Sequence, residues 1–318
     1  MAHTQNVISV MNFRKYYNSV KAVDGISFTV KAGEIFGMVG PNGSGKTTTL
    51  ESIAGLRIPD EGEVRVLGLD PLEDSQTLKE RIGIQLQSSN LPHRMRVCEA
   101  LDLFASFYQH AIDWKLLIDK LGLVDKQRSY FSQLSGGQKQ RLFIALALIN
   151  QPEIVFLDEL TTGLDPQARR VTWDLVREIR SSGTTVFLTT HFMDEAENLC
   201  DRVAILDHGR VIALDTPTRL VSQLDTDMRI TFHVVDLDGD KKASSGKNFT
   251  PAMIGVLDGV QRVEQSGDQV EVYGKGSGLV SSLIAALEAE QVRFNNLRTE
   301  QSNLEDVFLA LTGRLIRN

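Results

Sequence analysis

The sequence predicts an α/β protein whose main domain is a parallel β-sheet covered by helices on both faces. Apolar runs of strand length occur at Ile35–Val39, Ile154–Leu157 and Thr184–Leu188. Helical patterns at Thr48–Ala54 and Gln138–Ile149 alternate with them along the chain. A strand that is apolar along its whole length must be buried on both sides, and the repeated strand–helix–strand order joins such strands in parallel.

Further elements are expected on either side of these runs. They are strands at Val7–Phe13 and Ile26–Val30, one helix over Glu99–Leu121, and a rim hairpin that joins Val203–Leu206 to Val211–Leu214. Asp165 is expected to cap another helix, because Pro166 stands in its first turn.

The composition changes after about residue 224, where a smaller domain is expected. Its predicted elements follow the order β-α-β-β-α-β, which is typical of a ferredoxin-like α+β unit. They are a strand at Met228–Val235, a helix near Pro251–Leu257, strands at Val260–Val263 and Gln269–Tyr273, a helix at Leu279–Glu290 and a strand at Val292–Leu297, with a polar loop at Asp236–Asn248. We therefore divide the chain into residues 1–224 and an accessory or regulatory domain of residues 225–318.

A last helix is expected between Asn303, which can cap it, and Gly313, which closes it. Its apolar stripe consists of Leu304, Val307, Phe308 and Leu311. We expect this stripe to be buried within its own small sheet. The alternative is that part of it packs against a second subunit and holds two chains together.

Composition and charge exclude several classes of protein. The chain has 318 residues, of which 42% are hydrophobic and 24% charged, as in a soluble protein of about two domains. A net charge of -7 leaves no basic stripe for nucleic acid. Cys98 and Cys200 lack metal-ligand neighbours, which favours free thiols in a reducing cytosol. The longest apolar run, Leu142–Ile149, is too short to span a membrane, and Met1–Val10 does not resemble a signal peptide.

A glycine-rich loop predicts nucleotide binding. Gly40–Thr47 fits the phosphate-binding pattern G-x-x-x-x-G-K-[ST] between a strand and a helix. Glycines allow successive backbone N–H groups to converge on phosphates, the helix start adds its dipole, and Lys46 adds a positive charge. The residues expected to bind ATP here are Gly40, Pro41, Asn42, Gly43, Ser44, Gly45, Lys46, Thr47 and Thr48. The main domain is therefore predicted to be a P-loop NTPase with a RecA-like core.

Two carboxylates at the end of a later strand predict the site of hydrolysis. Asp158 and Glu159 directly follow the buried run Ile154–Leu157. Asp158 is expected to hold Mg²⁺ together with the Thr47 hydroxyl, and Glu159 to accept a proton from the attacking water. Acidic residues are common where a strand enters a loop, but the P-loop upstream favours the catalytic interpretation.

Further motifs resemble those of ATP-binding-cassette (ABC) ATPases. Leu134–Gln138 resembles the signature sequence of that family, Thr161–Asp165 its D-loop, and the pair Thr190-His191 its switch histidine. The signature lies between the P-loop and Asp158, as the family requires. These motifs follow the family's order over about residues 10 to 215.

Two weaker matches complete the resemblance. Gln87 matches the Q-loop position, although Gln85 lies on the same face of the predicted strand and competes for the assignment. Tyr17 is similar to the aromatic residue that stacks on adenine. Taken alone, a single tyrosine is more often a core residue and a single histidine a satisfied polar residue, so only the joint order of motifs carries the assignment.

The resemblance implies a P-loop core with an antiparallel β-subdomain and a helical signature lobe at about residues 88–150. It also implies a homodimer, or a heterodimer with a related ATPase, in which the signature of one chain binds the ATP of the other. The residues acting across the pair are Ser135, Gly136, Gly137, Gln138 and Asp165. The catalytic residues are Glu159, His191, Gln87 and Lys46; the Mg²⁺ ligands are Thr47, Gln87 and Asp158; and Tyr17 joins the P-loop in binding ATP.

One departure and several alternatives accompany the resemblance. Leu160 stands where the family usually has proline, and leucine loosens the loop after the base, which leaves the hydrolysis rate open. Asn303–Gly313 resembles the end of daunorubicin-resistance-type ATPase subunits, which drive exporters through a separate integral-membrane permease. This implies a peripheral protein on the cytoplasmic face of the membrane. The alternatives are an importer ATPase, a non-transport cassette ATPase and a silent regulator; the presence of Lys46 and Glu159 opposes the last.

Overall fold

The computed structural model describes residues 5–224, 228–235, 249–276 and 278–313. These residues form two compact units, of which the first ends at Pro217 and the second covers Thr218–Gly313. The boundary expected from composition, after residue 224, lies seven residues later. The difference arises because the short helix α8 (Pro217–Ser222) belongs largely to the second unit, whereas the change in composition marks the approach to its first strand.

The first unit is organised around a six-stranded sheet in the order β5-β6-β7-β3-β8-β9. Its strands are β3 (Ile35–Val39), β5 (Ile82–Gln85), β6 (Ile154–Asp158), β7 (Thr185–Thr190), β8 (Arg202–Asp207) and β9 (Arg210–Asp215). The pairs from β5 through β8 are parallel, and β9 returns antiparallel to β8 as the expected hairpin. Every residue of β3, β6 and β7 is buried, which confirms the prediction from their apolar runs.

A separate antiparallel sheet has the order β2-β1-β4. It consists of β1 (Asn6–Tyr17), β2 (Val20–Lys31) and β4 (Glu61–Val66). Its inner face shares one apolar core with the central sheet, in which Phe28 stacks on Phe36 with ring centroids 5.3 Å apart. Phe187 on β7 lies 5.6 Å from Phe36 and 5.7 Å from Phe156. This aromatic cluster stabilises the sheet that carries the site, because each buried ring removes a large apolar area from water.

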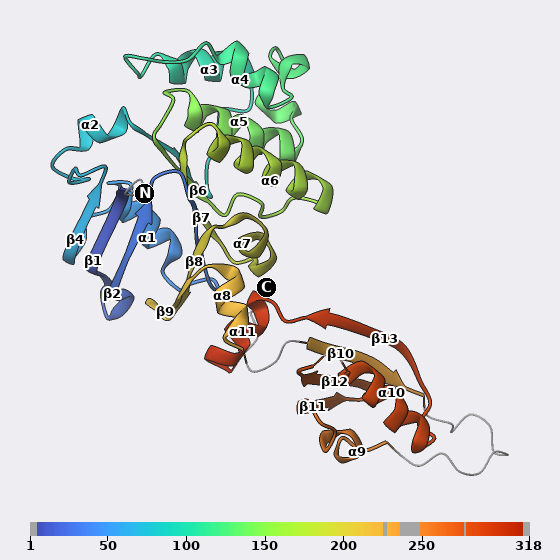
Figure 1. The fold of residues 1–318 in the computed structure, drawn as a ribbon. Coiled ribbons are helices and arrows are strands. Elements are labelled where there is room, and N and C mark those ends of the chain that lie inside the picture. Colours follow the sequence, from blue (N-terminus) through green and yellow to red (C-terminus); the bar gives the residue numbers. More distant parts are fainter. Residues whose placement is uncertain (1–4, 225–227, 236–248, 277, 314–318) are drawn as a thin grey trace. The chain divides into compact units, whose positions relative to one another are not determined.

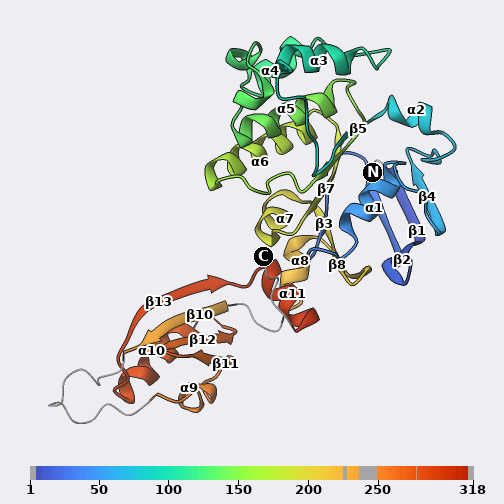
Figure 2. The same ribbon diagram turned by 180° about the vertical axis from the view of Figure 1, so that it is seen from behind.

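Helices cover both faces of the central sheet. Helix α1 (Lys46–Ile53) lies on the side of the antiparallel sheet, and α6 (Pro166–Ser181) and α7 (Met193–Leu199) lie on the other side, as Figures 1 and 2 show. Between β5 and β6 the chain forms a helical lobe, where one was predicted at about residues 88–150 (Figure 1). Its α-helices are α3 (Val97–Ala105), α4 (Trp114–Lys120) and α5 (Gly136–Leu148), and α2 (Ser75–Lys79) precedes β5.

The single helix expected over Glu99–Leu121 is wrong, because α3 ends at Ala105 and α4 begins at Trp114. Asp113 caps α4, and its carboxylate accepts a hydrogen bond from the Lys115 N–H at 3.0 Å. A side-chain cap of this kind competes with continuation of a helix through its own position. The apolar spacing across the break therefore reflects two short helices with similar faces.

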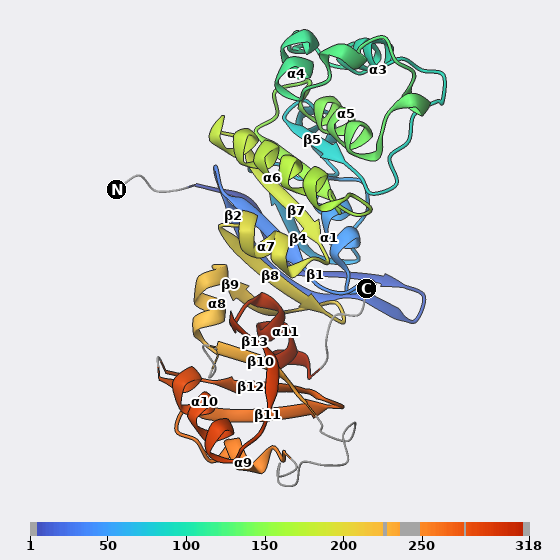
Figure 3. The same ribbon diagram turned by 90° about the vertical axis from the view of Figure 1, so that its right-hand side faces the viewer.

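The second unit contains a four-stranded sheet in the order β11-β12-β10-β13, with every neighbouring pair antiparallel (Figure 3). Its elements are β10 (Met228–Val234), α9 (Ala252–Gly255), β11 (Val260–Ser266), β12 (Gln269–Gly274), α10 (Leu279–Ala289), β13 (Phe294–Gln301) and α11 (Leu304–Thr312). The sequence predicted this β-α-β-β-α-β order. The loop expected at Asp236–Asn248 lies outside the described residues.

The core of the second unit is apolar and lies between the sheet and the helices α9 and α10. It includes Ile230, Phe232, Val270, Val272 and Leu283. Asn303 caps α11 and Gly313 closes it in a left-handed conformation, as predicted. The apolar stripe of α11 is buried except for Leu311, which is 51% exposed. The described core between the sheet and α9 and α10 contains no α11 side chain, and burial of the stripe within its own small sheet stays a prediction.

Candidate active site

The P-loop connects β3 to α1 and leaves the start of that helix free of side chains. Gly45 occupies the N-cap with φ +105°, and a Cβ atom there would lie 2.4 Å from the Ala22 carbonyl oxygen, so only glycine fits. In the described structure no side chain caps α1. The N–H groups of its first turn are therefore available to an anion, and the helix dipole favours negative charge at the same place.

Lys46 is the first residue of α1, and its side chain is 4% exposed. Its ammonium donates hydrogen bonds to the carbonyl oxygens of Gly40 at 2.8 Å and Pro41 at 3.1 Å. Nζ also lies 3.8 Å from Oε1 of Glu159. Burial lowers the pKa of Lys46, and the carboxylates of Glu159 and Asp158 raise it in part. The result is a positive charge enclosed by the loop that is predicted to bind phosphates.

Asp158 ends β6 and is fully buried. Its carboxylate accepts hydrogen bonds from the Thr189 hydroxyl and from the Thr47 hydroxyl, the latter at 3.2 Å. Burial raises the pKa of Asp158, and the bonds from Thr189 and Thr47 lower it in part. The strand end thus brings Asp158 to the first turn of α1, where the sequence predicted a shared metal site with Thr47.

Glu159 follows with a left-handed backbone, at φ +47°, and a carboxylate that is nearly enclosed. A non-glycine residue in this region costs about 1–3 kcal/mol, and such strain gathers at functional sites. The Glu159 N–H donates to the Thr189 carbonyl oxygen at 3.0 Å, which holds this turn against β7. The turn directs the carboxylate to groups from three other segments.

Those groups are the other residues predicted to be catalytic. The Gln87 amide donates to Oε2 of Glu159 at 2.7 Å, and Nδ1 of His191 lies 3.4 Å from Oε1. With Lys46 at 3.8 Å, the structure brings Gln87, His191 and Lys46 around one carboxylate. Gln85 is buried and donates instead to the Leu86 carbonyl oxygen at 2.9 Å, so the geometry favours Gln87 over its competitor.

Tyr17 lies apart from this cluster, at the end of β1. Its ring is 38% exposed, and the charged groups of Lys15 and Arg57 each lie 5.6 Å from its centroid. An exposed aromatic face is suited to stacking on a flat base. None of the hydrogen bonds described for the P-loop residues involves this tyrosine.

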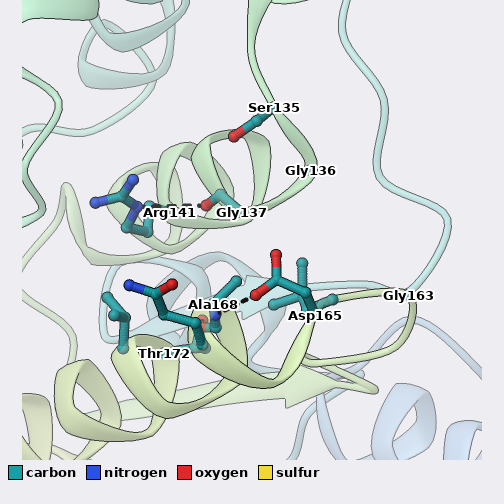
Figure 4. A pocket seen from close by; sticks show the side chains of 11 residues that line it. Ser135, Gly136, Gly137, Arg141, Gly163, Asp165, Ala168 and Thr172 are labelled. Carbon is teal, nitrogen blue, oxygen red and sulfur yellow. Dashed lines mark hydrogen bonds between the residues drawn. The ribbon is translucent and has the colours of Figure 1, made fainter.

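The signature residues line a second site of about 330 Å³, between the starts of α5 and α6 (Figure 4). Ser135 caps α5: its hydroxyl accepts from the Gln138 N–H at 3.3 Å, and the Gln138 side chain accepts from the Ser135 N–H at 2.9 Å. Gly136 and Gly137 form the first turn. Opposite them, Asp165 caps α6 by accepting from the Ala168 N–H at 2.8 Å. Two helix N-termini therefore face one cavity.

This signature cavity and the P-loop are separate within one chain. The described lining of the cavity includes Ser135, Gly136, Gly137, Gly163 and Asp165, and no P-loop residue. One chain thus carries the predicted phosphate-binding loop beside Asp158 and Glu159, and elsewhere a separate cavity at two helix N-termini, where negative charge is favoured.

Comparison with known proteins identifies the family. Residues 23–162 match the ABC transporter family. The Nod factor export ATP-binding protein I of Ralstonia nicotianae is 37% identical, with 98% of this chain and 95% of the relative covered. The chain belongs to the ABC transporter ATP-binding proteins. It is an ATPase subunit coupled to transport.

Further relatives of this ABC ATPase include the daunorubicin/doxorubicin resistance ATP-binding protein DrrA of Streptomyces peucetius. It is 35% identical, with 94% of this chain and 90% of the relative covered. Among solved structures, the dimeric post-hydrolysis state of the cassette MJ0796 bound to ADP and phosphate has a TM-score of 0.59 at 29% identity, covering 66% of this chain and 98% of that chain. The ADP conformation of the cassette MJ1267 has a TM-score of 0.61 at 26% identity, covering 68% of this chain and 93% of that chain.

The structure of the ABC ATPase also contains polar groups that sequence reasoning missed. The Thr189 hydroxyl bonds Asp158, and the Thr162 hydroxyl donates to Oε2 of Glu159 at 3.3 Å. Glu195 is buried on α7. For Thr189 a signal was present, since two threonines end an apolar strand directly before His191. Among the described residues, no helix is both long and apolar enough to cross a membrane.

Proposed function

We propose that this ABC ATPase works as a pair of chains on the cytoplasmic face of the membrane, where it drives export through a separate permease. The observation that carries the pairing is the separation of the P-loop from the signature cavity within one chain. Neither half can enclose a nucleotide by itself. The dimeric structures of the similar cassette MJ0796 support this arrangement. The export and drug-resistance names of two relatives support the direction of transport.

In this proposal the ATP of one chain lies on its own P-loop and against the signature cavity of the partner. The backbone N–H groups at the start of α1 and the Lys46 ammonium bind the β- and γ-phosphates. Ser135 and the first-turn amides of the partner's α5 then bind the γ-phosphate from the other side. Tyr17 stacks on the adenine. Two nucleotides bound in this way hold the pair together, and loss of the γ-phosphate releases it.

Hydrolysis requires a base beside the attacking water, and Glu159 is suited to that role. Its carboxylate takes a proton as the water oxygen forms a bond to the γ-phosphorus, and the bond from that phosphorus to the ADP oxygen breaks. Gln87 and His191 lie close to the same carboxylate and orient the water and the terminal phosphate. Lys46 offsets the negative charge that leaves with ADP.

Thr47, Asp158 and Gln87 offer the oxygen ligands that Mg²⁺ prefers, and their positions fit a metal–nucleotide site. The Thr47 hydroxyl and the Asp158 carboxylate already lie 3.2 Å apart beside the P-loop. Mg²⁺ binds proteins through one or two such groups while it keeps substrate phosphate and water in its shell. When bound, the ion neutralises phosphate charge. We propose that Asp158 would retain the ion and that Gln87, two residues beyond the end of β5, would supply a further oxygen ligand.

A second surface of the cassette supports a membrane partner. A cavity of about 230 Å³ lies between α2, β5, the end of α3 and α5, and it is lined by Ile82, Ile84, Phe104 and Tyr108 among others. Phe107 at its edge is 64% exposed. An apolar cavity with an exposed aromatic rim favours an amphipathic helix of another chain. β5 leads directly to Gln87, so a permease helix docked here is proposed to sense the occupied site through that residue.

The substitution Glu159→Gln tests the proposal. The amide keeps the size of the side chain but accepts no proton, so turnover should fall by at least about 100-fold. ATP binding should persist, and the trapped nucleotide should hold two chains together. Size-exclusion chromatography should therefore show a dimer with ATP that is absent with ADP.

Glu178→Gln is the matched control, because Glu178 is exposed on α6. That variant should hydrolyse ATP at the wild-type rate. An active Glu159→Gln protein would refute the base assignment. An inactive one that stays monomeric with bound ATP would refute the pairing.

A further inference from the structure

A buried carboxyl group lies between α6 and the switch-histidine segment and has no part in the chemistry described above. Glu195 is on α7, four residues after His191, and is 1% exposed. The Trp173 indole on α6 donates a hydrogen bond to its Oε1 at 3.0 Å. Its Oε2 has no hydrogen-bond partner among the described residues. A carboxyl group is expensive to bury, so a position that retains one needs a reason beyond packing.

Two hydroxyl groups near this carboxyl come from the segments that carry the catalytic residues. Burial raises the pKa of Glu195, and the hydroxyls of Thr190 and Thr161 lower it in part. Thr161 is two residues beyond Glu159, and Thr190 directly precedes His191. The Thr161 hydroxyl is fully buried and, within the described chain, it too has no hydrogen-bond partner.

The two unpartnered oxygens can satisfy each other. If Oε2 is ionised, the Thr161 hydroxyl donates to it; if Oε2 is protonated, it donates to that hydroxyl. Either bond ties the segment after Glu159 to α7. Leaving two buried polar atoms without a hydrogen bond is costly in free energy. Formation of the bond between Glu195 and Thr161 is therefore favoured when the site is fully assembled.

Helix α6 also contacts the residues that directly follow His191. Arg169 on α6 lies 3.3 Å from the Asp194 carboxylate, and its guanidinium lies 4.1 Å from the centre of the Phe192 ring. The Phe192 ring in turn lies 4.1 Å from the imidazole of His191. Asp165 of the D-loop caps α6, and Phe192 after the switch histidine and Glu195 both contact side chains of that helix.

We propose that Glu195 is a positioning residue for ATP hydrolysis, whose carboxyl links Trp173 on α6 to Thr161 and Thr190 and so fixes Glu159 and His191 relative to each other. This inference rests on the proposed roles of Glu159 and His191. In this proposal Glu195, which is 1% exposed, acts through other residues and not by contact with the nucleotide or the attacking water. Its loss should therefore slow the chemical step while the P-loop, to which it contributes nothing, binds ATP as before.

The test compares Glu195→Ala with Glu195→Gln in the full-length chain. Glu195→Ala should lower kcat by about 10- to 100-fold, while the Kd for ATP in a direct titration stays within about 2-fold of the wild-type value. Glu195→Gln keeps the volume, an acceptor for Trp173 and a donor for Thr161, so it should recover kcat to within about 3-fold of wild type. Wild-type turnover in Glu195→Ala overturns the proposal. Equal loss in both variants overturns it too, since the hydrogen bonds would then not matter.

A second variant keeps the proposal testable if Glu195→Ala does not fold. Thr161→Val removes the hydroxyl and preserves the shape of the side chain, and it should lower kcat by about 3- to 10-fold. Added to Glu195→Leu, which removes the carboxyl group but keeps its bulk, it should lower kcat by much less than it does alone if the two residues act through one bond. Fully additive effects, or a wild-type rate in Thr161→Val, contradict the link. An active Glu159→Gln protein would instead mark failure of the proposed function, whatever the Glu195 variants do.

Discussion

The first unit of this chain buries charged side chains on its central strands and on the helices that follow them, whereas the described charged side chains of the second unit are all at least partly exposed. Lys46, Asp158 and Glu195 are each at most 4% exposed. In the second unit, Ser302 is the one described side chain that is buried without being apolar or aromatic. Its ion pairs, such as Arg262 with Glu264 at 3.3 Å, join half-exposed groups.

This difference in burial distinguishes the unit that carries the candidate site from the second unit, which we call the scaffold. Removing a charge from water is costly unless partners replace its hydration. The first unit supplies those partners through Thr47, Thr189 and Gln87, and the resulting low-dielectric cluster is where phosphate chemistry is favoured. The second unit carries no such cluster among its described residues, and its described core is apolar.

The largest effect is expected from breaking the scaffold. Phe232 is fully buried in the core of the second unit, so Phe232→Ala should destabilise that unit by about 3–5 kcal/mol. Hydrogen exchange of the β10 and β12 amides measures this loss. The Kd for ATP should stay within about 2-fold of wild type, because the P-loop belongs to the other unit.

Thr231→Ala is the matched control, since Thr231 neighbours Phe232 on β10 but points away from the core. It should change the exchange rates little. A large loss of ATP affinity in Phe232→Ala would contradict the distinction between the two units, because nucleotide binding would then depend on the core of the second unit.

A smaller effect is expected from removing one buried charge of the site. Lys46→Ala deletes the ammonium that is proposed to bind the β- and γ-phosphates, so ATP affinity should fall by about 10- to 100-fold. A direct nucleotide titration measures it. Lys275→Ala, in the second unit, should leave the Kd unchanged. Unaltered affinity in Lys46→Ala would contradict the P-loop assignment.

The elements that the sequence predicted best are those whose signal is local. The apolar runs of β3 and β6 require burial on both faces. The glycine-rich pattern that contains Gly45 and Lys46 predicts a phosphate-binding loop without any knowledge of tertiary contacts. Asp158 and Glu159 were placed from the strand that precedes them. Each of these features is determined by a few adjacent residues.

The features that escaped prediction depend on contacts between distant segments. Four polar positions in eight residues make Met193–Cys200 look solvent-exposed, so nothing marks Glu195 as a buried group bonded to Trp173. The choice between Gln85 and Gln87 needed the position of Glu159. The break between α3 and α4 was hidden by matching apolar spacing on both sides, with Asp113 as its one local sign.

Hydrolysis by two half-sites from different chains is the central claim, and a mixing experiment tests it most directly. Lys46→Ala disables the P-loop of one chain, and Ser135→Arg blocks the signature cavity of the other, so each homodimer should be inactive. In the mixed pair, both defects fall on one nucleotide site, and the other site has an intact P-loop facing an intact signature.

The measurement is ATPase activity of the mixed pair, with heterodimer formation confirmed by two affinity tags. The account predicts partial activity in the mixture and none in either variant alone. The same two variants carrying Glu159→Gln should form an ATP-dependent dimer only when mixed. A confirmed heterodimer that neither hydrolyses ATP nor, in the Glu159→Gln background, traps it would contradict sites built from two chains.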